Sequence, residues 1–181
     1  MQGVERVVLA RELSLAEIKE IYEFCPETQL EAFVHGAMCI SYSGRCLLSN
    51  YFNGRDANRG ECVQACRWSY ELRERSKSGE FFPVEEDGRG TYVLNSKDLN
   101  MINHIGEMIE SGICSLKIEG RMKSEYYLAT VVNAYRRAID EYYKIGDKYA
   151  KNTMFYDELK KTNHRAFTSA YMFGDNDETV N

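Results

Sequence analysis

The sequence is poor in proline, histidine and tryptophan, and it has no long apolar run. Its 181 residues include 2 Pro, 3 His and 1 Trp. No apolar segment approaches the ~18 residues of a membrane-spanning helix, and the N-terminus lacks an apolar signal segment, so we expect a protein of the cytoplasm. The histidines form no His-Glu-x-x-His motif, which excludes that class of zinc peptidase. A net charge of −5 excludes a surface that is basic throughout.

Four of the six cysteines lie in one short segment that is rich in glycine and arginine. They are Cys39, Cys46, Cys62 and Cys66, separated by six, fifteen and three residues. Thiols stay reduced in the cytoplasm, so these cysteines indicate a metal, redox chemistry or the core rather than disulfides. Four thiolates are the ligand set of a [4Fe–4S] cluster. Structural zinc and unliganded cysteines are the alternatives, and Cys25 and Cys114 are expected to be packing residues.

The same segment carries a local positive charge. Between residues 36 and 75, six arginines stand against four acidic residues, an excess of two positive charges. Arginine suits bidentate contact with phosphates. Arg45, Arg55, Arg67 and the lone Trp68 therefore form a candidate RNA-binding set, through phosphate contact and base stacking. A solvated loop of mixed charge is the alternative for the arginines, and core packing is the alternative for Trp68.

The hydrophobic pattern alternates between strands and helices. Strands are expected at residues 6–10, 30–35, 91–95 and 115–119. The first helix should begin at the capping box Ser14–Glu17. A second should run from Ser96 to Gly112 with Leu99 in its apolar stripe, and a third from Ser124 to near Gly146 with Leu128 and Val132 in its stripe. This order indicates an α/β fold with parallel strands.

The number of strands suggests part of a larger architecture. About four are visible, whereas a TIM-like (β/α) barrel has about eight. We expect residues 1–150 to form the C-terminal half of such a barrel, with the cysteine-rich loop at 36–75 as an insertion. Residues 151–181 would be a C-terminal extension or a linker to another domain. Open sheet edges favour a homo-oligomer or a domain swap, and half a barrel is expected to be inactive by itself.

Polar residues follow the C-terminal ends of the expected strands, where such folds place their chemistry. His35 ends the second strand, and Glu119 and Arg121 follow the last. These three are the candidate catalytic residues, and Arg121 can hold the carboxylate of a small acid in a bidentate pair. The alternative for Glu119 and Arg121 is an ion pair that braces the turn.

Longer stretches of the sequence resemble a known family. Residues 31–49, EAFVHGAMCISYSGRCLLS, resemble the signature of the collagenase-like peptidase family U32. Residues 50–68, NYFNGRDANRGECVQACRW, and 117–124, KIEGRMKS, resemble the branch of that family that hydroxylates tRNA. Residues 165–168, RAFT, resemble a further element usually written Arg-Gly-Phe-Thr, with Ala166 in the glycine place.

The resemblance implies an enzyme that hydroxylates the wobble uridine of tRNA with prephenate as a required metabolite. It also implies that Cys39, Cys46, Cys62 and Cys66 hold a [4Fe–4S] cluster, because they match the ligand positions of related proteins one by one. The family name implies a peptidase instead, for which a Cys39–His35 dyad is the conceivable nucleophile and base. Cys39 cannot easily serve both as a cluster ligand and as a free nucleophile. A non-catalytic RNA-binding module is the third hypothesis.

Overall fold

A computed structural model describes residues 3–39, 41–68, 71–72, 82–83, 97–146 and 153–174 of the chain. Short strands alternate with helices, and the longest element is a helix near the C-terminal end. The strands are β1 (Arg6–Val8), β2 (Gln29–Ala37), β3 (Glu71–Leu72), β4 (Phe82–Pro83), β5 (Asp98–Asn100), β6 (Ile113–Ile118) and β7 (Phe167–Thr168). The helices are α1 (Leu15–Phe24), α2 (Leu48–Asn53), α3 (Ile105–Glu110), α4 (Glu125–Ile145) and α5 (Thr153–Leu159).

These elements belong to two compact units, which are described separately. One comprises the chain up to Met38 and from Lys97 onward, and the other runs from Cys39 to Ser96. The first unit contains a five-stranded sheet, and the second contains α2, the β3–β4 pair and two short 3₁₀ turns. Within the described part of the chain, no helix is both long and apolar enough to cross a bilayer.

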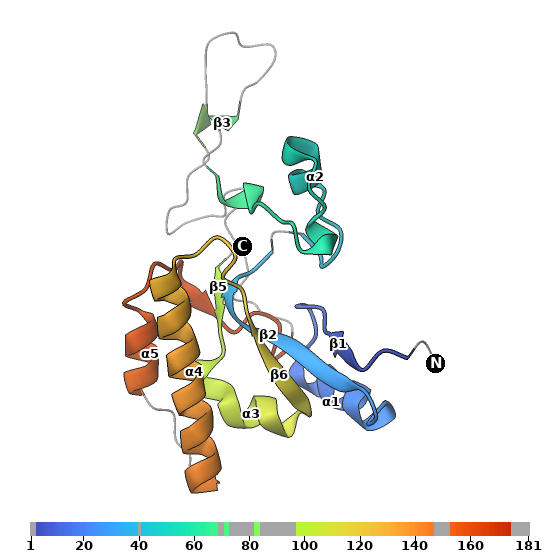
Figure 1. Cartoon of the computed structure of the whole chain (residues 1–181), viewed down its shortest axis with the longest axis vertical. Helices are drawn as coiled ribbons and strands as arrows, with labels where there is room; N and C mark the ends of the chain where they lie inside the picture. Colours follow the sequence, from blue (N-terminus) through green and yellow to red (C-terminus); the bar gives the residue numbers. More distant parts are fainter. Residues whose placement is uncertain are drawn as a thin grey trace. The chain divides into compact units, whose positions relative to one another are not determined.

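The sheet of the first unit is centred on β2 (Figure 1). Strands β1 and β6 both pair with β2 in parallel, which confirms the expected parallel α/β arrangement for these three. Strand β5 pairs with β2 antiparallel, and β7 then pairs with β5 in parallel. The all-parallel expectation is therefore wrong for β5. The architecture is α/β, as expected. The sheet is open within the described residues, so the expected barrel is not seen there.

Local capping explains where the predicted helices begin. Ser14 accepts a hydrogen bond from the backbone N–H of Glu17 at 3.3 Å, while the Glu17 carboxylate accepts from the Ser14 N–H at 2.8 Å. This reciprocal pair satisfies two backbone donors at the start of α1 and confirms the predicted capping box. Ser124 caps α4 in the same way by accepting from the N–H of Tyr127.

The helix expected from Ser96 to Gly112 begins later than predicted. Leu99 is in β5 opposite Gly36, and the chain turns into a 3₁₀ turn at Ile102–His104 before α3. The Asn100 side chain accepts the N–H of Ile102 at 3.1 Å, which fixes this change of direction. Non-local strand pairing thus overrides a stripe that matches helical periodicity. The strand expected at 91–95 lies outside the described residues.

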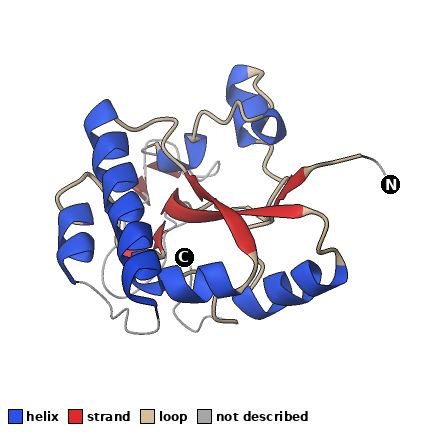
Figure 2. Ribbon diagram, turned by 60° about the horizontal axis from the view of Figure 1, so that its bottom comes forward, coloured by secondary structure: helices blue, strands red, loops and turns tan. Residues whose placement is uncertain are grey.

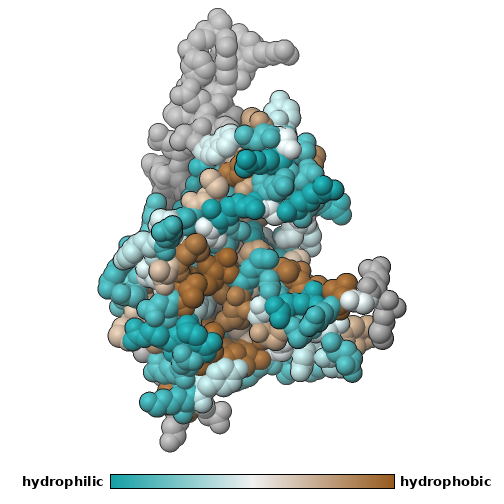
Figure 3. Space-filling model, viewed as in Figure 1, coloured by the Kyte–Doolittle hydropathy of each residue, from teal (hydrophilic) through white to brown (hydrophobic). Residues whose placement is uncertain are grey.

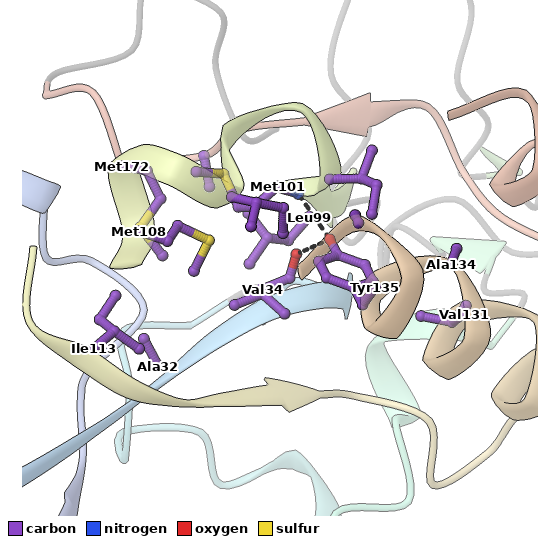
Figure 4. Close-up of a cluster of buried hydrophobic side chains, with 14 of the residues drawn as sticks. Ala32, Val34, Leu99, Met101, Met108, Ile113, Val131, Ala134, Tyr135 and Met172 are labelled. Atoms are coloured by element: carbon purple, nitrogen blue, oxygen red, sulfur yellow. Dashed lines mark hydrogen bonds between the residues drawn. The ribbon is translucent and has the colours of Figure 1, made fainter. Parts of the chain in front are cut away.

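Helix α4 supplies much of the apolar core (Figure 4). Its buried side chains are Tyr127, Val131, Ala134, Tyr135 and Ala138. Leu128 and Val132, expected in the buried stripe, are 37% and 53% exposed. The buried face is therefore rotated from the predicted one, because Tyr127 and Ala134 pack inward. Figure 2 shows α1, α3 and α4 gathered on one side of the sheet.

The C-terminal segment returns to the same core. Phe155 and Leu159 of α5 are 4% and 0% exposed and belong to the central cluster of buried side chains. The following strand, β7, places Thr168 opposite Leu99. Residues 153–174 therefore add a helix and an edge strand to the first unit.

A bulge near the end of β2 changes which side chains face the core. The pairing of β2 with β6 shifts between Phe33 and His35, so Val34 and His35 are both buried although they are consecutive. The next residue, Gly36, has φ +101°, and the backbone of Glu119 passes directly against it. Bulges of this kind re-aim side chains at the ends of strands.

Apolar side chains also reach the surface of the first unit, as brown areas in Figure 3. Val7 and Val8 of β1 are 39% and 46% exposed. Among the described strands, β1 and β6 each pair with β2 alone, and these exposed valines lie on one of the resulting edges. The edges retain unpaired backbone groups beside apolar surface.

Replacing Gly36 with alanine is expected to destabilise the first unit strongly. The added Cβ would overlap the carbonyl oxygen of Glu119 and lie 3.1 Å from the Glu119 Cβ, in a backbone conformation that alanine rarely adopts. Strain and overpacking together should cost roughly 2–5 kcal/mol of unfolding free energy. Urea denaturation followed by circular dichroism measures this cost.

The matched control is Gly146→Ala. Gly146 also has a positive φ, +56°, but nothing lies within 4 Å of an added Cβ. Its φ of +56° with ψ of −131° is a combination that alanine rarely adopts, so it should lose roughly 1–3 kcal/mol from conformational strain alone, without any overlap. Equal losses in the two variants would contradict the close approach of Glu119 to Gly36.

Candidate functional site

His35 is the most deeply buried of the predicted catalytic residues. It follows the bulge of β2 and is 1% exposed. Three aromatic rings surround it, from Tyr127, Tyr135 and Phe167, with ring centroids 6.0, 5.5 and 5.6 Å away. Helix α4 provides the two tyrosines and β7 the phenylalanine. The imidazole is thus enclosed by side chains from elements far apart in the sequence.

The hydroxyl of Tyr135 determines which nitrogen of His35 carries the proton. This hydroxyl donates to the carbonyl of Val34 at 2.8 Å and accepts from the N–H of Met101 at 3.0 Å (Figure 4). Because the phenol hydrogen is already donated to Val34, the phenol oxygen can only accept at its 3.4 Å contact with His35 Nδ1. We therefore assign Nδ1 as the protonated nitrogen that donates to it. Burial raises the pKa of Tyr135 well above its usual value, so the phenol stays neutral.

The other ring nitrogen, Nε2, is left as a buried acceptor. It has no hydrogen-bond partner among the described residues. Burial lowers the pKa of His35 to about 4, and the negative charge of Asp98 opposes this shift without cancelling it. His35 is therefore a neutral imidazole at pH 7. With so low a pKa this imidazole is a weak base, and its available lone pair is suited to accept a hydrogen bond rather than to hold a proton.

Charged side chains lie close to this imidazole. Asp98 is 1% exposed, accepts the backbone N–H of Arg165 at 3.1 Å and lies 3.9 Å from the Nζ of Lys123. The charges of His164 and Lys123 both lower the pKa of His35. A buried carboxylate and two basic side chains thus flank a neutral histidine, a grouping often found at functional sites.

Sequence patterns did not identify Asp98, Asn100 or the hydroxyl of Tyr135. Asn100 lies opposite His35 in the β2–β5 register, and its Nδ2 is buried without a partner among the described residues. Cross-strand partners place their side chains on the same face. The sequence does contain a signal, because Asp98 and Asn100 flank Leu99 in the alternation of a strand. A helix interpretation instead places both polar residues on the surface.

Glu119 and Arg121 do not form the ion pair with each other that was the alternative to a catalytic role. The Glu119 carboxylate accepts the backbone N–H of Arg121 at 3.1 Å and pairs with Arg11 Nη2 at 3.5 Å. The guanidinium of Arg11 stacks on Phe33, 3.8 Å from the ring centroid. Glu119 is therefore held by a basic residue from the end of the first strand, while Arg121 is exposed. An exposed guanidinium beside a fixed carboxylate can still bind an acidic ligand.

The four cysteines of the predicted metal site all lie in the second unit. Each is half-buried and outside any disulfide: Cys39, Cys46, Cys62 and Cys66. The sulfur of Cys62 lies 3.5 Å from the Ser49 hydroxyl and accepts a hydrogen bond from the backbone N–H of Gln64 at 3.3 Å. Gln64 has φ +55°, a conformation that non-glycine residues seldom adopt. The backbone here is bent so that a donor faces the sulfur.

Four cysteine thiols are the right number and type of ligand for a [4Fe–4S] cluster, but in this structure they are not arranged around a common point. Over the ranges that the structure describes, no three His, Cys, Asp or Glu side chains lie close enough together to hold one metal ion. The cysteines would have to move toward one another before they shared a metal. Cys39, expected to act with His35 in a peptidase dyad, lies in the other unit.

The predicted RNA-binding residues are also in the second unit. Arg45 and Arg55 are exposed, Arg67 is half-buried in a 3₁₀ turn, and Trp68 is 46% exposed. The alternative that Trp68 packs in the core is therefore wrong. Its ring is available to a ligand.

Removing the buried imidazole should flatten part of the dependence of stability on pH. The pKa of His35 is about 4 in the folded chain against 6.5 for an ordinary histidine, so the unfolded state takes up the proton first as the pH falls. The contribution of His35 to the unfolding free energy is fully present above about pH 6.5. It is lost as the pH falls toward about 4, and the total loss is on the order of 3 kcal/mol. Urea unfolding of the wild type and His35→Gln across this range measures the difference.

Ile105→Ala is the control for general destabilisation. Ile105 is 0% exposed and carries no titrating group, so its truncation should lower stability at every pH and preserve the slope. A slope in His35→Gln identical to that of the wild type would contradict a neutral buried imidazole.

Comparison with known proteins gives this arrangement a family. Residues 1–181 match the family described as Peptidase family U32. The chain is 45% identical over 173 residues to "tRNA hydroxylation protein P1" of Bacillus subtilis (strain 168), which covers 96% of the chain and 40% of that protein. It is 35% identical over 176 residues to the "23S rRNA 5-hydroxycytidine C2501 synthase" of Escherichia coli (strain K12), covering 94% and 26%.

A third relative carries a different kind of name. The chain is 36% identical over 146 residues to "Collagenase" of Porphyromonas gingivalis (strain ATCC BAA-308 / W83), covering 75% of the chain and 34% of that protein. No solved structure matches the chain. The chain spans less than half the length of these relatives. Its match along the whole sequence shows that it belongs to peptidase family U32.

Proposed function

We propose that the protein containing this chain hydroxylates RNA, with the wobble uridine of tRNA as its target. The observation that carries the proposal is the 45% identity, over nearly the whole chain, to a relative named for tRNA hydroxylation. A second relative is named for hydroxylation of a cytidine in ribosomal RNA. The excess of arginine beside the cysteines supports an RNA partner, because phosphate contacts favour guanidinium groups.

The residues of the first unit fit the binding and orientation of substrates in such a reaction. Arg121, exposed just after β6, is the candidate for binding a carboxylate of prephenate, the proposed co-substrate. The ion pair with Arg11 keeps the carboxylate of Glu119 in place beside it. His35 is the candidate hydrogen-bond acceptor for the substrate, since its Nε2 has no partner in the described part of the chain and its lowered pKa keeps the ring neutral.

The four cysteines are proposed as ligands of a [4Fe–4S] cluster because their number and chemistry match that group. A bound cluster would supply redox chemistry that the side chains lack. The described arrangement does not gather three of these thiols, so no reaction step is assigned to the cluster.

A peptidase is the competing function, since the family description and one relative carry that name. A nucleophilic cysteine or serine requires a base within hydrogen-bond reach. The free nitrogen of His35 has no such partner among the described residues. RNA hydroxylation is therefore the better-supported function, and gelatin cleavage by the purified protein would favour the alternative.

Deletion of the gene should remove a hydroxylated uridine from tRNA. The measurement is mass spectrometry of nucleosides from purified tRNA of the parent strain, the deletion strain and complemented strains. The wild-type gene should restore the nucleoside, and a gene encoding Cys62→Ala/Cys66→Ala should not. An unchanged nucleoside profile after deletion would refute the proposal.

The cluster has a separate test that needs no turnover. Protein purified without oxygen should contain about four iron and four acid-labile sulfide per chain, which the Cys62→Ala/Cys66→Ala variant loses. Cys25→Ala/Cys114→Ala is the matched control, because these two cysteines are exposed and lie in the other unit, and it should keep the metal. Zinc in place of iron would make the loop a structural site. A protein without any metal would rule the cluster out.

A further inference from the structure

Three aromatic rings stand exposed next to one another in the second unit. Tyr51 and Phe52, at the end of α2, are 81% and 45% exposed, and Trp68 is 46% exposed. The ring centroids of Tyr51 and Phe52 are 5.1 Å apart, and those of Phe52 and Trp68 are 5.8 Å apart. Large aromatic side chains usually turn inward, so a contiguous exposed set marks a binding surface. We call these three residues the aromatic platform.

The surrounding loop holds the platform together. Ser49, in α2 and 1% exposed, accepts the backbone N–H of Val63 at 3.1 Å. This buried contact ties α2 to the segment that leads to Trp68. The helix then ends at Gly54, whose φ of +64° lets the chain turn back. Rings that are sixteen residues apart in the sequence are therefore fixed side by side rather than meeting by chance.

The segment that carries the platform, from Cys39 to Trp68, is rich in arginine. The described residues from Cys39 to Trp68 include four arginines, Arg45, Arg55, Arg59 and Arg67, against Asp56 and Glu61. The difference is two positive charges, whereas the whole chain has a net charge of −5. Asp56 is already engaged by the side chain of Asn50 at 2.8 Å and by Arg59 at 3.9 Å. Arg45, Arg55 and Arg59 are exposed and belong to the same unit as the rings.

We propose that the aromatic platform binds single-stranded RNA by stacking unpaired bases, with the nearby arginines contacting phosphates. This inference rests on the proposed function, for which it names the surface that receives the substrate. Exposed rings bind any base through its π-face, and each stacked base contributes substantially to affinity. Guanidinium groups supply the phosphate contacts that rings cannot make. A protein partner would also use aromatic residues, but the exposed arginines of the same segment favour a polyanion.

Trp68 offers a direct readout because it is the only tryptophan. A short single-stranded oligouridylate should quench its fluorescence on binding, while an RNA duplex of the same length should not. Affinities come from the fluorescence anisotropy of end-labelled RNA. Affinity should fall steeply with salt, since phosphates are contacted.

Variants separate stacking from charge. Tyr51→Ala and Phe52→Ala should each weaken binding of the single strand roughly 5- to 100-fold, and Phe52→Tyr should retain it. Arg55→Gln should weaken single strands and duplexes alike and reduce the salt slope by about one. Phe24→Ala is the control, since Phe24 is 87% exposed but belongs to the first unit, and it should change nothing.

The outcomes distinguish the platform from the proposed function. Equal binding of single strand and duplex, or full affinity in Phe52→Ala, would overturn the platform even if tRNA hydroxylation is established. Loss of hydroxylation without loss of binding leaves the platform intact. Concentration-dependent self-association that Phe52→Ala abolishes, with no RNA binding, would make the rings a protein interface and also overturn the proposal.

Discussion

The hydroxyl of Tyr135 is the interaction on which the first unit depends most. It joins α4 to the Val34 carbonyl of β2 and to the Met101 N–H that follows β5, and it orients His35 through Nδ1. The Met101 N–H also donates directly to the Val34 carbonyl at 3.0 Å, so the phenol completes a buried three-way contact between these groups. One oxygen therefore holds a helix on two strands and sets the tautomer of the histidine.

Much of the first unit could be predicted because its signals are local. The capping box of α1, the serine cap of α4 and the apolar runs of β1, β2 and β6 act within a few residues, and the structure follows them. Leu99 was misassigned because its partner, Gly36, lies on the far side of a long insertion. The exposed Leu128 and Val132 show the same limit, since periodicity gives the stripe of a helix but not the element that covers it.

In the candidate site, too, the sequence indicates individual residues but not the contacts between distant ones. Sequence identified His35, Glu119 and the four cysteines by residue type and position. It could not show that Glu119 pairs with Arg11, because those residues meet only through the parallel sheet. It also missed Asp98 and the phenol of Tyr135, which act on His35 from β5 and α4. For the cysteines, spacing gives the donor count but not the distances between sulfurs, and the described arrangement keeps them apart.

The backbone hydrogen bond between Met38 and Lys97, 3.4 Å long, brings both ends of the second unit to one point on the first. The insertion therefore leaves the first unit and returns to it at neighbouring residues, as a closed loop. Lengthening such a loop is inexpensive, about 0.6 kcal/mol for each doubling. The region that carries the cysteines and the aromatic rings can thus be rebuilt or extended during evolution while the sheet of the first unit stays unchanged.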